Sequence, residues 1–331
     1  MSNSLPAPVH AFAAGEFSSI AGSFAAAGYQ VHMPARGILQ LLMPESSQRH
    51  VRLLLSAGVH GDETAPIEML ADLLHKLATT PGALRVNLLL VIGNPSAIGQ
   101  GRRFVEADMN RMFRAERGEL ASAAEAGRAD AIMQATEQFF RDANTEKWHF
   151  DLHTAIRPSL YPTFAVVPDV HLPARRQLLL GWFGRAGIGA AILSAPSAGT
   201  FSAYTASRFG AASATVELGQ IGTFGGNDLS RFADAREALD AFLRTGQPPV
   251  SRKLPDVFRI AQEVVKHSEA FRLMLDRDVM NFTALLPGTL IAEDGDFEYR
   301  VGPVTEHVIF PNPDVRVGLR AGLMVVRDRS A

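Results

Sequence analysis

The residue types of a catalytic metal site occur in three short motifs: HGDE at His60–Glu63, DLHT at Asp151–Thr154 and VELG at Val216–Gly219. The first two motifs together offer two histidines and one carboxylate, the ligand set that holds a catalytic zinc while leaving one position open for water. The third offers a further glutamate, Glu217, which would be a proton acceptor if it lay near that water. These residue types favour a zinc hydrolase.

The candidate ligands are His60 and Glu63, three positions apart in one motif, and His153 from another. A lone H-x-x-E pattern is weak, and alone it has roughly one chance in ten of marking a metal site. The ordered combination of the three motifs is much more specific. Two interpretations of Asp151 stay open: an acceptor that fixes a histidine tautomer, or a charge at a strand end in solvent.

Each candidate ligand lies at the carboxyl end of a predicted strand, where open α/β sheets place their ligands. Gly58 and Gly61, on either side of His60, would let the backbone turn sharply there. The predicted strands are short apolar runs: Val51–Ser56, Val86–Ile92, Trp148–Leu152, Phe164–Val167, Ala190–Leu193 and Ala214–Leu218.

Helical patterns separate several of these strands. Apolar residues recur at helical spacing over Pro66–Leu77, and Ala121–Phe140 is rich in the good helix formers Ala and Glu. Arg175–Phe183 and Ser230–Leu243 also have the character of helices. Strands that alternate with helices predict an α/β fold with a mixed, mostly parallel sheet flanked by helices.

The composition changes after Gly246-Gln-Pro-Pro-Val250, which predicts a domain boundary. We expect a catalytic α/β domain over residues 1–246 and a smaller C-terminal β domain over residues 247–331, because short apolar runs separated by turn residues follow the boundary. These runs are Phe258–Val265, Ala270–Leu275, Phe297–Tyr299, Val304–Ile309 and Leu323–Arg327.

The composition narrows the class of protein. The 331 residues are 47% hydrophobic and 20% charged, and the net charge of −2 gives no case for nucleic acid or an anionic membrane as partner. Without cysteine, a metal must be held by His and carboxylate. Met1–Gly28 makes a poor secretion signal, since no Lys or Arg precedes its apolar part and Glu16 interrupts it. We expect a cytoplasmic protein that acts on a small molecule, with a homo-oligomer left open.

The motifs also carry a family resemblance. HGDE, the segment NPSAIGQGRRFVEADMNRMF at Asn94–Phe113, DLHTAIR and TVELG together resemble the succinylglutamate desuccinylase and aspartoacylase family, whose core is similar to the zinc carboxypeptidases. The tail EHVIFPNPDVRVGLRAGLM at Glu306–Met324 resembles the desuccinylase branch. The resemblance implies one zinc per chain, amide hydrolysis, and a β domain that closes over an α/β core.

Carried over position by position, the resemblance makes His60, Glu63 and His153 the zinc ligands and Glu217 the general base. Alone, Glu217 would fit a salt-bridged structural carboxylate better; within this pattern the base is favoured. Arg103 matches the arginine that polarises the scissile carbonyl in the family. On spacing alone, Arg102 is a competing candidate for this role. Asn110 and Arg111 match the pair of residues that holds a substrate carboxylate. The other interpretation of this segment is a charged loop with internal pairs from Arg to Glu106 and Asp108.

The implied reaction is hydrolysis of N-succinyl-L-glutamate to succinate and L-glutamate, the last step of arginine degradation through succinylated intermediates. Such a substrate is polyanionic, and Arg157 and Arg208 are further candidates for its succinyl carboxylate. Two alternatives remain: deacylation of another N-acyl amino acid such as N-acetylaspartate, and a zinc- or anion-binding module without turnover. Replacement of zinc by another divalent metal is also open.

Overall fold

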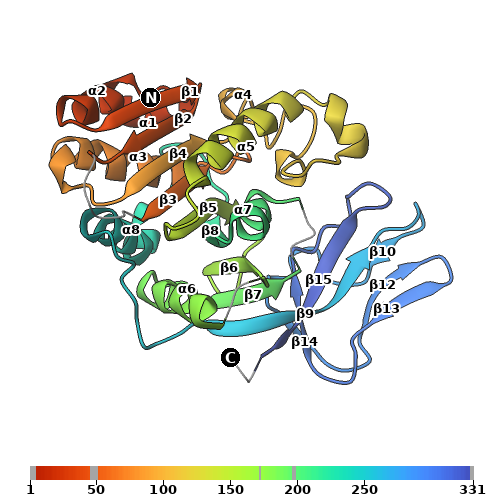
Figure 1. The fold of residues 1–331 in the computed structure, drawn as a ribbon. Helices are drawn as coiled ribbons and strands as arrows, with labels where there is room; N and C mark the ends of the chain where they lie inside the picture. The colour runs from red at the N-terminus through yellow and green to blue at the C-terminus, as the bar shows by residue number, and fades with distance from the viewer. Residues whose placement is uncertain (1–4, 45–50, 171–172, 196–198, 329–331) are drawn as a thin grey trace.

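A 12-stranded mixed sheet organises the chain in the computed structural model, which describes residues 5–44, 51–170, 173–195 and 199–328 (Figure 1). The strand order is β1-β2-β4-β3-β5-β8-β6-β7-β9-β15-β14-β11, and a second sheet has the order β10-β12-β13. Helices flank the large sheet, and short strands make up the C-terminal part. The predicted α/β fold with a C-terminal β region is confirmed.

The centre of the sheet consists of four parallel strands: β4 (Asn87–Ile92), β3 (Arg52–Ala57), β5 (Lys147–Ala155) and β8 (Ala212–Gln220). Most of their residues are buried, as expected for parallel strands covered on both faces. Each lies where an apolar run predicted it. Their carboxyl ends therefore meet at one edge, which is where the candidate ligands occur.

Three further strands continue this sheet toward the C-terminal part. β6 (Thr163–Pro168) pairs antiparallel with β8, and β7 (Ala190–Ser194) pairs parallel with β6. β9 (Asp256–Val265) then pairs parallel with β7. Because β9 lies beyond the predicted boundary, the sheet itself connects the two predicted domains.

Helices cover both faces of the sheet. On one face, the apolar side chains of α3 (Ala65–Ala78), α6 (Pro173–Arg185) and α8 (Ala233–Thr245) pack in one core with Leu53, Leu55 and Phe150. On the other face, α5 (Ala126–Phe140) and α7 (Phe201–Phe209) pack with Leu54, Leu89 and Val91. Residues 53, 54 and 55 alternate between the two cores, as a strand's period of two requires.

The first 44 residues contain elements that the sequence did not predict. They form α1 (Ala7–Ala14), α2 (Ser18–Ala26) and the antiparallel pair β1 (Gln30–Ala35) and β2 (Ile38–Leu42). The two helices bury their phenylalanines in the core around α3. Short helices occur elsewhere at Pro81–Ala83 (η1), Pro95–Gly99 (α4), Met109–Arg111 (η2), Gly118–Ser122 (η3) and Leu229–Phe232 (η5).

The C-terminal part adds strands to one edge of the large sheet and builds the small sheet beside it. Its strands are β10 (Arg272–Leu273), β11 (Ala284–Leu285), β12 (Leu290–Asp294), β13 (Phe297–Arg300), β14 (Glu306–Ile309) and β15 (Arg320–Arg327). The division at residue 246 stays a prediction, and the outer ends of both predicted domains, residues 1–4 and 329–331, lie outside the described residues. Over the described ranges, no helix is long and apolar enough to cross a membrane.

Candidate metal centre

The loop between β3 and α3 carries two of the candidate ligands. Gly58 has φ +66°, a left-handed conformation that favours glycine, so the predicted sharp turn is present there. Gly61 has a different reason to be glycine, because a Cβ at this position would lie 2.4 Å from the carbonyl carbon of Ala97. This close approach lets the Gly61 N–H donate to the Arg103 carbonyl oxygen at 3.0 Å, which brings the HGDE and arginine loops together.

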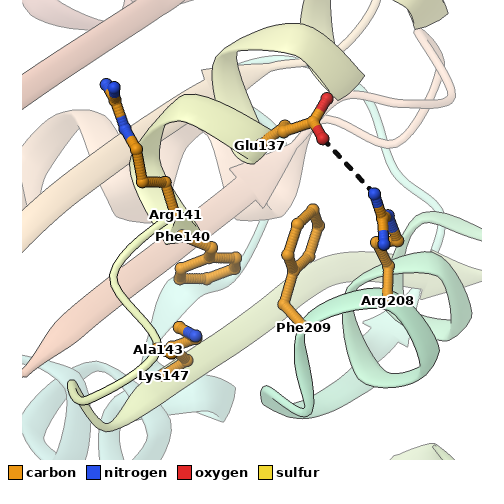
Figure 2. Close-up of a pocket in the computed structure, with 7 residues that line it drawn as sticks. All are labelled: Glu137, Phe140, Arg141, Ala143, Lys147, Arg208 and Phe209. Atoms are coloured by element: carbon orange, nitrogen blue, oxygen red, sulfur yellow. Dashed lines mark ion pairs between the residues drawn. The ribbon is translucent and has the colours of Figure 1, made fainter.

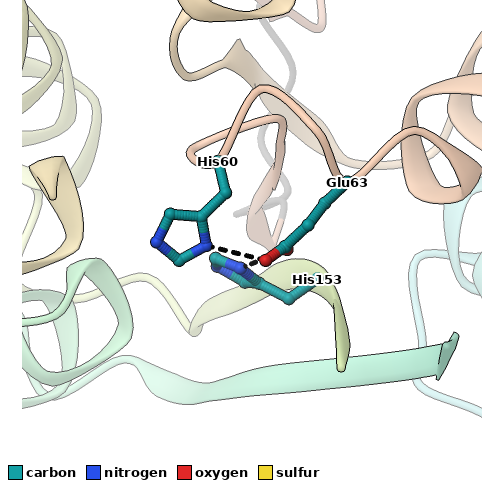
Figure 3. Close-up of side chains that lie close together, drawn as sticks. All are labelled: His60, Glu63 and His153. Atoms are coloured by element: carbon teal, nitrogen blue, oxygen red, sulfur yellow. Dashed lines mark hydrogen bonds and ion pairs between the residues drawn. The ribbon is translucent and has the colours of Figure 1, made fainter. Parts of the chain in front are cut away.

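The side chains of His60, Glu63 and His153 converge in the interior of the protein (Figure 3). The Nδ1 atom of His60 lies 2.8 Å from Oε1 of Glu63, and the Nδ1 atom of His153 lies 2.8 Å from Oε2 of the same carboxylate. One ligand atom from each residue lies within 4.8 Å of the others, and each residue is at most 4% exposed. The tertiary structure thus brings the three predicted ligands together.

A carboxylate also contacts the outer nitrogen of each histidine. Nε2 of His60 lies 2.9 Å from Oδ1 of Asp108, and Nε2 of His153 lies 2.9 Å from Oδ2 of Asp151. Asp151 is fully buried, so it is not a solvent-exposed strand-end charge. When Nδ1 binds a metal, a carboxylate behind the ring holds the remaining proton on Nε2 and so fixes the tautomer.

The three candidate ligands His60, Glu63 and His153, called the cluster below, shift one another's pKa values. Burial alone would raise the pKa of the Glu63 carboxyl, but the neighbouring His60 and His153 rings lower it well below its usual range. Burial acts to lower the pKa of His153, but the Asp151 and Glu63 carboxylates raise it well above its usual value. Glu63 is therefore an anion, ready to bind a cation.

Glu217 lies on β8 directly beside the cluster, because its register partner on β5 is His153. It is 7% exposed, and its Oε2 atom is buried with no hydrogen-bond partner among the described residues. Burial and the charge of Glu63 raise the pKa of Glu217 to about 7. A structural carboxylate would have a salt bridge here, whereas this one has an oxygen that is free to accept a proton.

The side chain of Arg103 contacts the cluster from the loop that follows α4. Its Nη1 atom donates to Oε1 of Glu63 at 2.8 Å and lies 3.9 Å from Oδ1 of Asp62. The guanidinium is partly exposed, so it lies where a bound molecule could meet it. The structure thus places Arg103 at the rim of the cluster.

The residues present fit a divalent cation. Two imidazole Nδ1 atoms and one carboxylate converge, and both outer nitrogens are bonded to carboxylates, as metal-binding histidines require. The side chains around the three candidate ligands include five carboxyl groups: Asp62, Glu63, Asp108, Asp151 and Glu217. Two arginines contact these carboxyl groups, Arg103 at Asp62 and Arg111 at Asp108. Against the effect of burial, these carboxylates raise the pKa values of His60 and His153, so a divalent cation that binds here would displace protons from the two rings.

Asn110 and Arg111 lie in the 3₁₀ turn η2, directly after Asp108, whose carboxylate contacts His60 of the cluster. The Asp108 side chain accepts from the Asn110 N–H at 2.9 Å and lies 3.8 Å from Nη2 of Arg111. The Asn110 side-chain oxygen accepts from the Phe201 N–H at 2.9 Å, so part of this amide holds the start of α7. The predicted pair from Arg111 to Asp108 therefore exists, and Asp108 contacts a candidate ligand as well.

One residue that shapes this loop was missed by the sequence analysis. Glu125 is 2% exposed, and its carboxylate accepts from the backbone N–H groups of Val105, Glu106 and Ala107 at 2.6–3.3 Å. It also accepts from the side chain of Asn94 at 3.3 Å. A glutamate before an Ala-rich helix resembles an ordinary first-turn residue, so no local signal distinguishes it.

The two further arginine candidates lie elsewhere. Arg157, two residues beyond the end of β5, donates to the carbonyl oxygens of Pro311 and Arg277 and so connects this loop to the C-terminal part. Arg208 pairs with Glu137 at 3.5 Å and lines a separate cavity of about 510 Å³ that contains none of the ligand candidates (Figure 2). Arg320, at the start of β15, lies within electrostatic range of Arg111 and 3.9 Å from Glu263: burial, with the charge of Arg111, lowers the pKa of Arg320, and Glu263 acts to raise it.

Comparisons with known proteins give concordant results. Residues 49–243 match the family described as the succinylglutamate desuccinylase/aspartoacylase catalytic domain, and residues 253–328 match the AstE/AspA barrel-sandwich hybrid domain. A protein named succinylglutamate desuccinylase from Burkholderia thailandensis is 41% identical over 309 residues, which cover 92% of this chain and 88% of that protein.

Two solved structures are similar over most of their length. The structure of the succinylglutamate desuccinylase from Chromobacterium violaceum has 36% identity and a TM-score of 0.78, with 94% of this chain and 98% of that chain covered. The corresponding structure from Vibrio parahaemolyticus has 32% identity and a TM-score of 0.83, with 91% and 88% covered.

Proposed function

We propose, from the premise that this chain belongs to the succinylglutamate desuccinylase/aspartoacylase family, that it is a zinc-dependent amidohydrolase. The proposed reaction is hydrolysis of N-succinyl-L-glutamate to succinate and L-glutamate, as the names of the similar proteins suggest. His60, Glu63 and His153 would hold one zinc ion per chain. Their convergence and the carboxylates behind both rings support this ligand set.

Amide hydrolysis needs an activated water and a proton for the departing amine. Zinc held by these residues would lower the pKa of a water molecule to about 7 and would polarise a carbonyl oxygen. Glu217 would accept the proton of the attacking water on its unpartnered Oε2 atom and later deliver it to the amine nitrogen of glutamate. A pKa of about 7 suits a group that takes and returns a proton near neutral pH.

The arginines would handle the negative charge of the substrate and of the reaction. Arg103 at the rim of the cluster would stabilise the oxyanion that forms as water adds to the carbonyl. Arg111, with the Asn110 amide, would bind one substrate carboxylate through the planar fork of its guanidinium. Arg320, which lies within electrostatic range of Arg111 and 3.9 Å from Glu263, would add a second cation for a polyanionic substrate.

The position of Glu217 is the observation that carries the hydrolase proposal. A module that only binds zinc or an anion has no use for an unpartnered buried carboxylate next to the ligands, since an unpaired buried acid costs free energy. An enzyme that moves a proton requires such a group.

The test is a hydrolysis assay on N-succinylglutamate and N-acetylaspartate with the protein as isolated, after metal removal, and after restoration with zinc. We expect turnover of N-succinylglutamate that disappears on stripping and returns with zinc. A strong preference for N-acetylaspartate would overturn the substrate proposal. Bound zinc without hydrolysis of either compound would overturn the enzyme proposal and support a binding module.

A further inference from the structure

A continuous chain of buried polar groups lies behind His153. His149, Asp151 and His153 alternate along β5, so their side chains lie on the same face of the sheet. Ser56 on β3 is the register partner of Asp151, and Ser213 on β8 is the register partner of His149. Every one of these residues is at most 2% exposed.

The contacts fix the direction of the hydrogen bonds that join His149, Ser56 and Asp151. The Ser56 hydroxyl lies 2.6 Å from Oδ1 of Asp151, and it must donate there because a carboxylate only accepts. Ser56 has one proton, so its contact of 2.9 Å with Nε2 of His149 requires that this nitrogen donates. The same carboxylate accepts from Nε2–H of His153 through Oδ2.

The second ring nitrogen of His149, Nδ1, faces α7. This Nδ1 atom lies 2.8 Å from the Thr205 hydroxyl of α7, and the Ser202 carbonyl oxygen is a second acceptor for that hydroxyl at 3.0 Å. The Thr205 oxygen in turn lies 2.9 Å from the Ser213 hydroxyl. Neutral His149 with its proton on Nε2 matches the donor that Ser56 requires and leaves Nδ1 as an acceptor. Burial lowers the pKa of His149 to about 4, which keeps the ring neutral at physiological pH.

We propose that His149 is a positioning residue for the metal site, which acts through Ser56 and Asp151 to hold His153 with Nδ1 toward the ion. This inference rests on the proposed zinc site. His149 does not touch the ligand cluster, but it supplies the donor that fixes the Ser56 hydroxyl on Asp151. With both oxygens of Asp151 occupied, the carboxylate has one orientation, and so does the His153 ring that donates to it. Such chains polarise each member and strengthen the bond at the end.

The experiment measures the dissociation constant for zinc by chelator competition, together with thermal unfolding of the stripped protein. Partners behind a metal-binding histidine typically change metal affinity 10–100-fold. We expect His149→Phe, which fills the space without a donor, and Ser56→Ala each to weaken zinc binding about 10-fold. His149→Gln keeps an N–H donor toward Ser56 and should stay close to the wild-type affinity.

Thr136→Val is the matched control. Thr136 is fully buried, and its hydroxyl bonds within α5 to the Ile132 carbonyl oxygen at 2.8 Å, away from the chain described above. It should lower the stability of the stripped protein without changing zinc affinity.

The outcomes separate the inference from the proposed function. Wild-type affinity in folded His149→Phe and Ser56→Ala would overturn the positioning role alone. Equal weakening by His149→Gln and His149→Phe would also overturn it, because the shape of the ring rather than its donor would then matter. A wild-type protein that binds no zinc would overturn the proposed function, and the inference with it.

Discussion

Glu217 and His153 are register partners on the adjacent parallel strands β8 and β5, so the proposed proton acceptor and a candidate metal ligand lie on the same face at neighbouring positions. Adjacent strands lie about 4.8 Å apart, which sets the spacing between the two side chains. This spacing comes from the pairing of β5 with β8 in the sheet. Four predictions follow from this pairing and from the groups that support it.

Glu217→Gln should abolish most of the activity while zinc stays bound. The amide of glutamine cannot accept the proton of water, and general base catalysis typically contributes 10²–10⁴-fold. We expect kcat to fall by about that factor and KM to change little, measured with zinc-saturated protein. Glu237→Gln, on the exposed face of α8, is the control. A Glu217→Gln variant with kcat close to the wild-type value would exclude Glu217 as the base.

The activity should rise with pH as Glu217 ionises. Burial raises the pKa of this carboxyl to about 7, and we expect a bound cation to offset part of this rise. The acid limb of kcat/KM should therefore have its midpoint between about 4.5 and 7, with a tenfold loss per pH unit below it. A pH–rate profile from pH 4 to 9 tests this, and a flat profile below pH 6 would contradict it.

Glu125→Ala should weaken the loop that carries Arg103 and Arg111. Three backbone N–H groups would lose their buried acceptor, at roughly 1–3 kcal/mol each when left unsatisfied. We expect a lower free energy of unfolding and a lower kcat/KM, measured by denaturant titration and steady-state kinetics. Glu119→Ala removes an exposed glutamate from a nearby turn and should do neither. Equal effects of the two substitutions would show that the loop does not depend on Glu125.

His149 should make the stripped protein sensitive to acid. Because burial lowers its pKa to about 4 in the folded state, the neutral ring contributes stability that is fully present above pH 6.5. The free energy of unfolding loses this contribution, roughly 3 kcal/mol in total, as the pH falls from 6.5 toward 4, because each unit of pKa difference is worth 1.36 kcal/mol. The free energy of unfolding of His149→Gln should fall less over this range. Parallel pH curves for the two proteins would refute the prediction.

The sequence determined the central strands, their covering helices and the identity of the ligand candidates. Apolar runs such as Val86–Ile92 became strands within a residue or two, because a buried parallel strand needs a continuous apolar segment. The HGDE and DLHT motifs lie at strand ends by local pattern alone. The sequence did not reveal α1, α2, β1 and β2, since their alanine-rich and short segments have weak periodicity and acquire their stability from packing on α3 and β4.

Only the tertiary structure decided which distant groups meet. Asp151 had two open interpretations until its burial and its bond to His153 excluded the solvent-exposed one. The contacts of Asp108 with His60, and of His149 with Ser56, join residues 48 and 93 positions apart, and no local pattern predicts such pairs. The free oxygen of Glu217 likewise depends on what the surrounding chain leaves unpaired. Residue type sets which chemistry is available, whereas strand register and burial set which atoms touch and what their pKa values become.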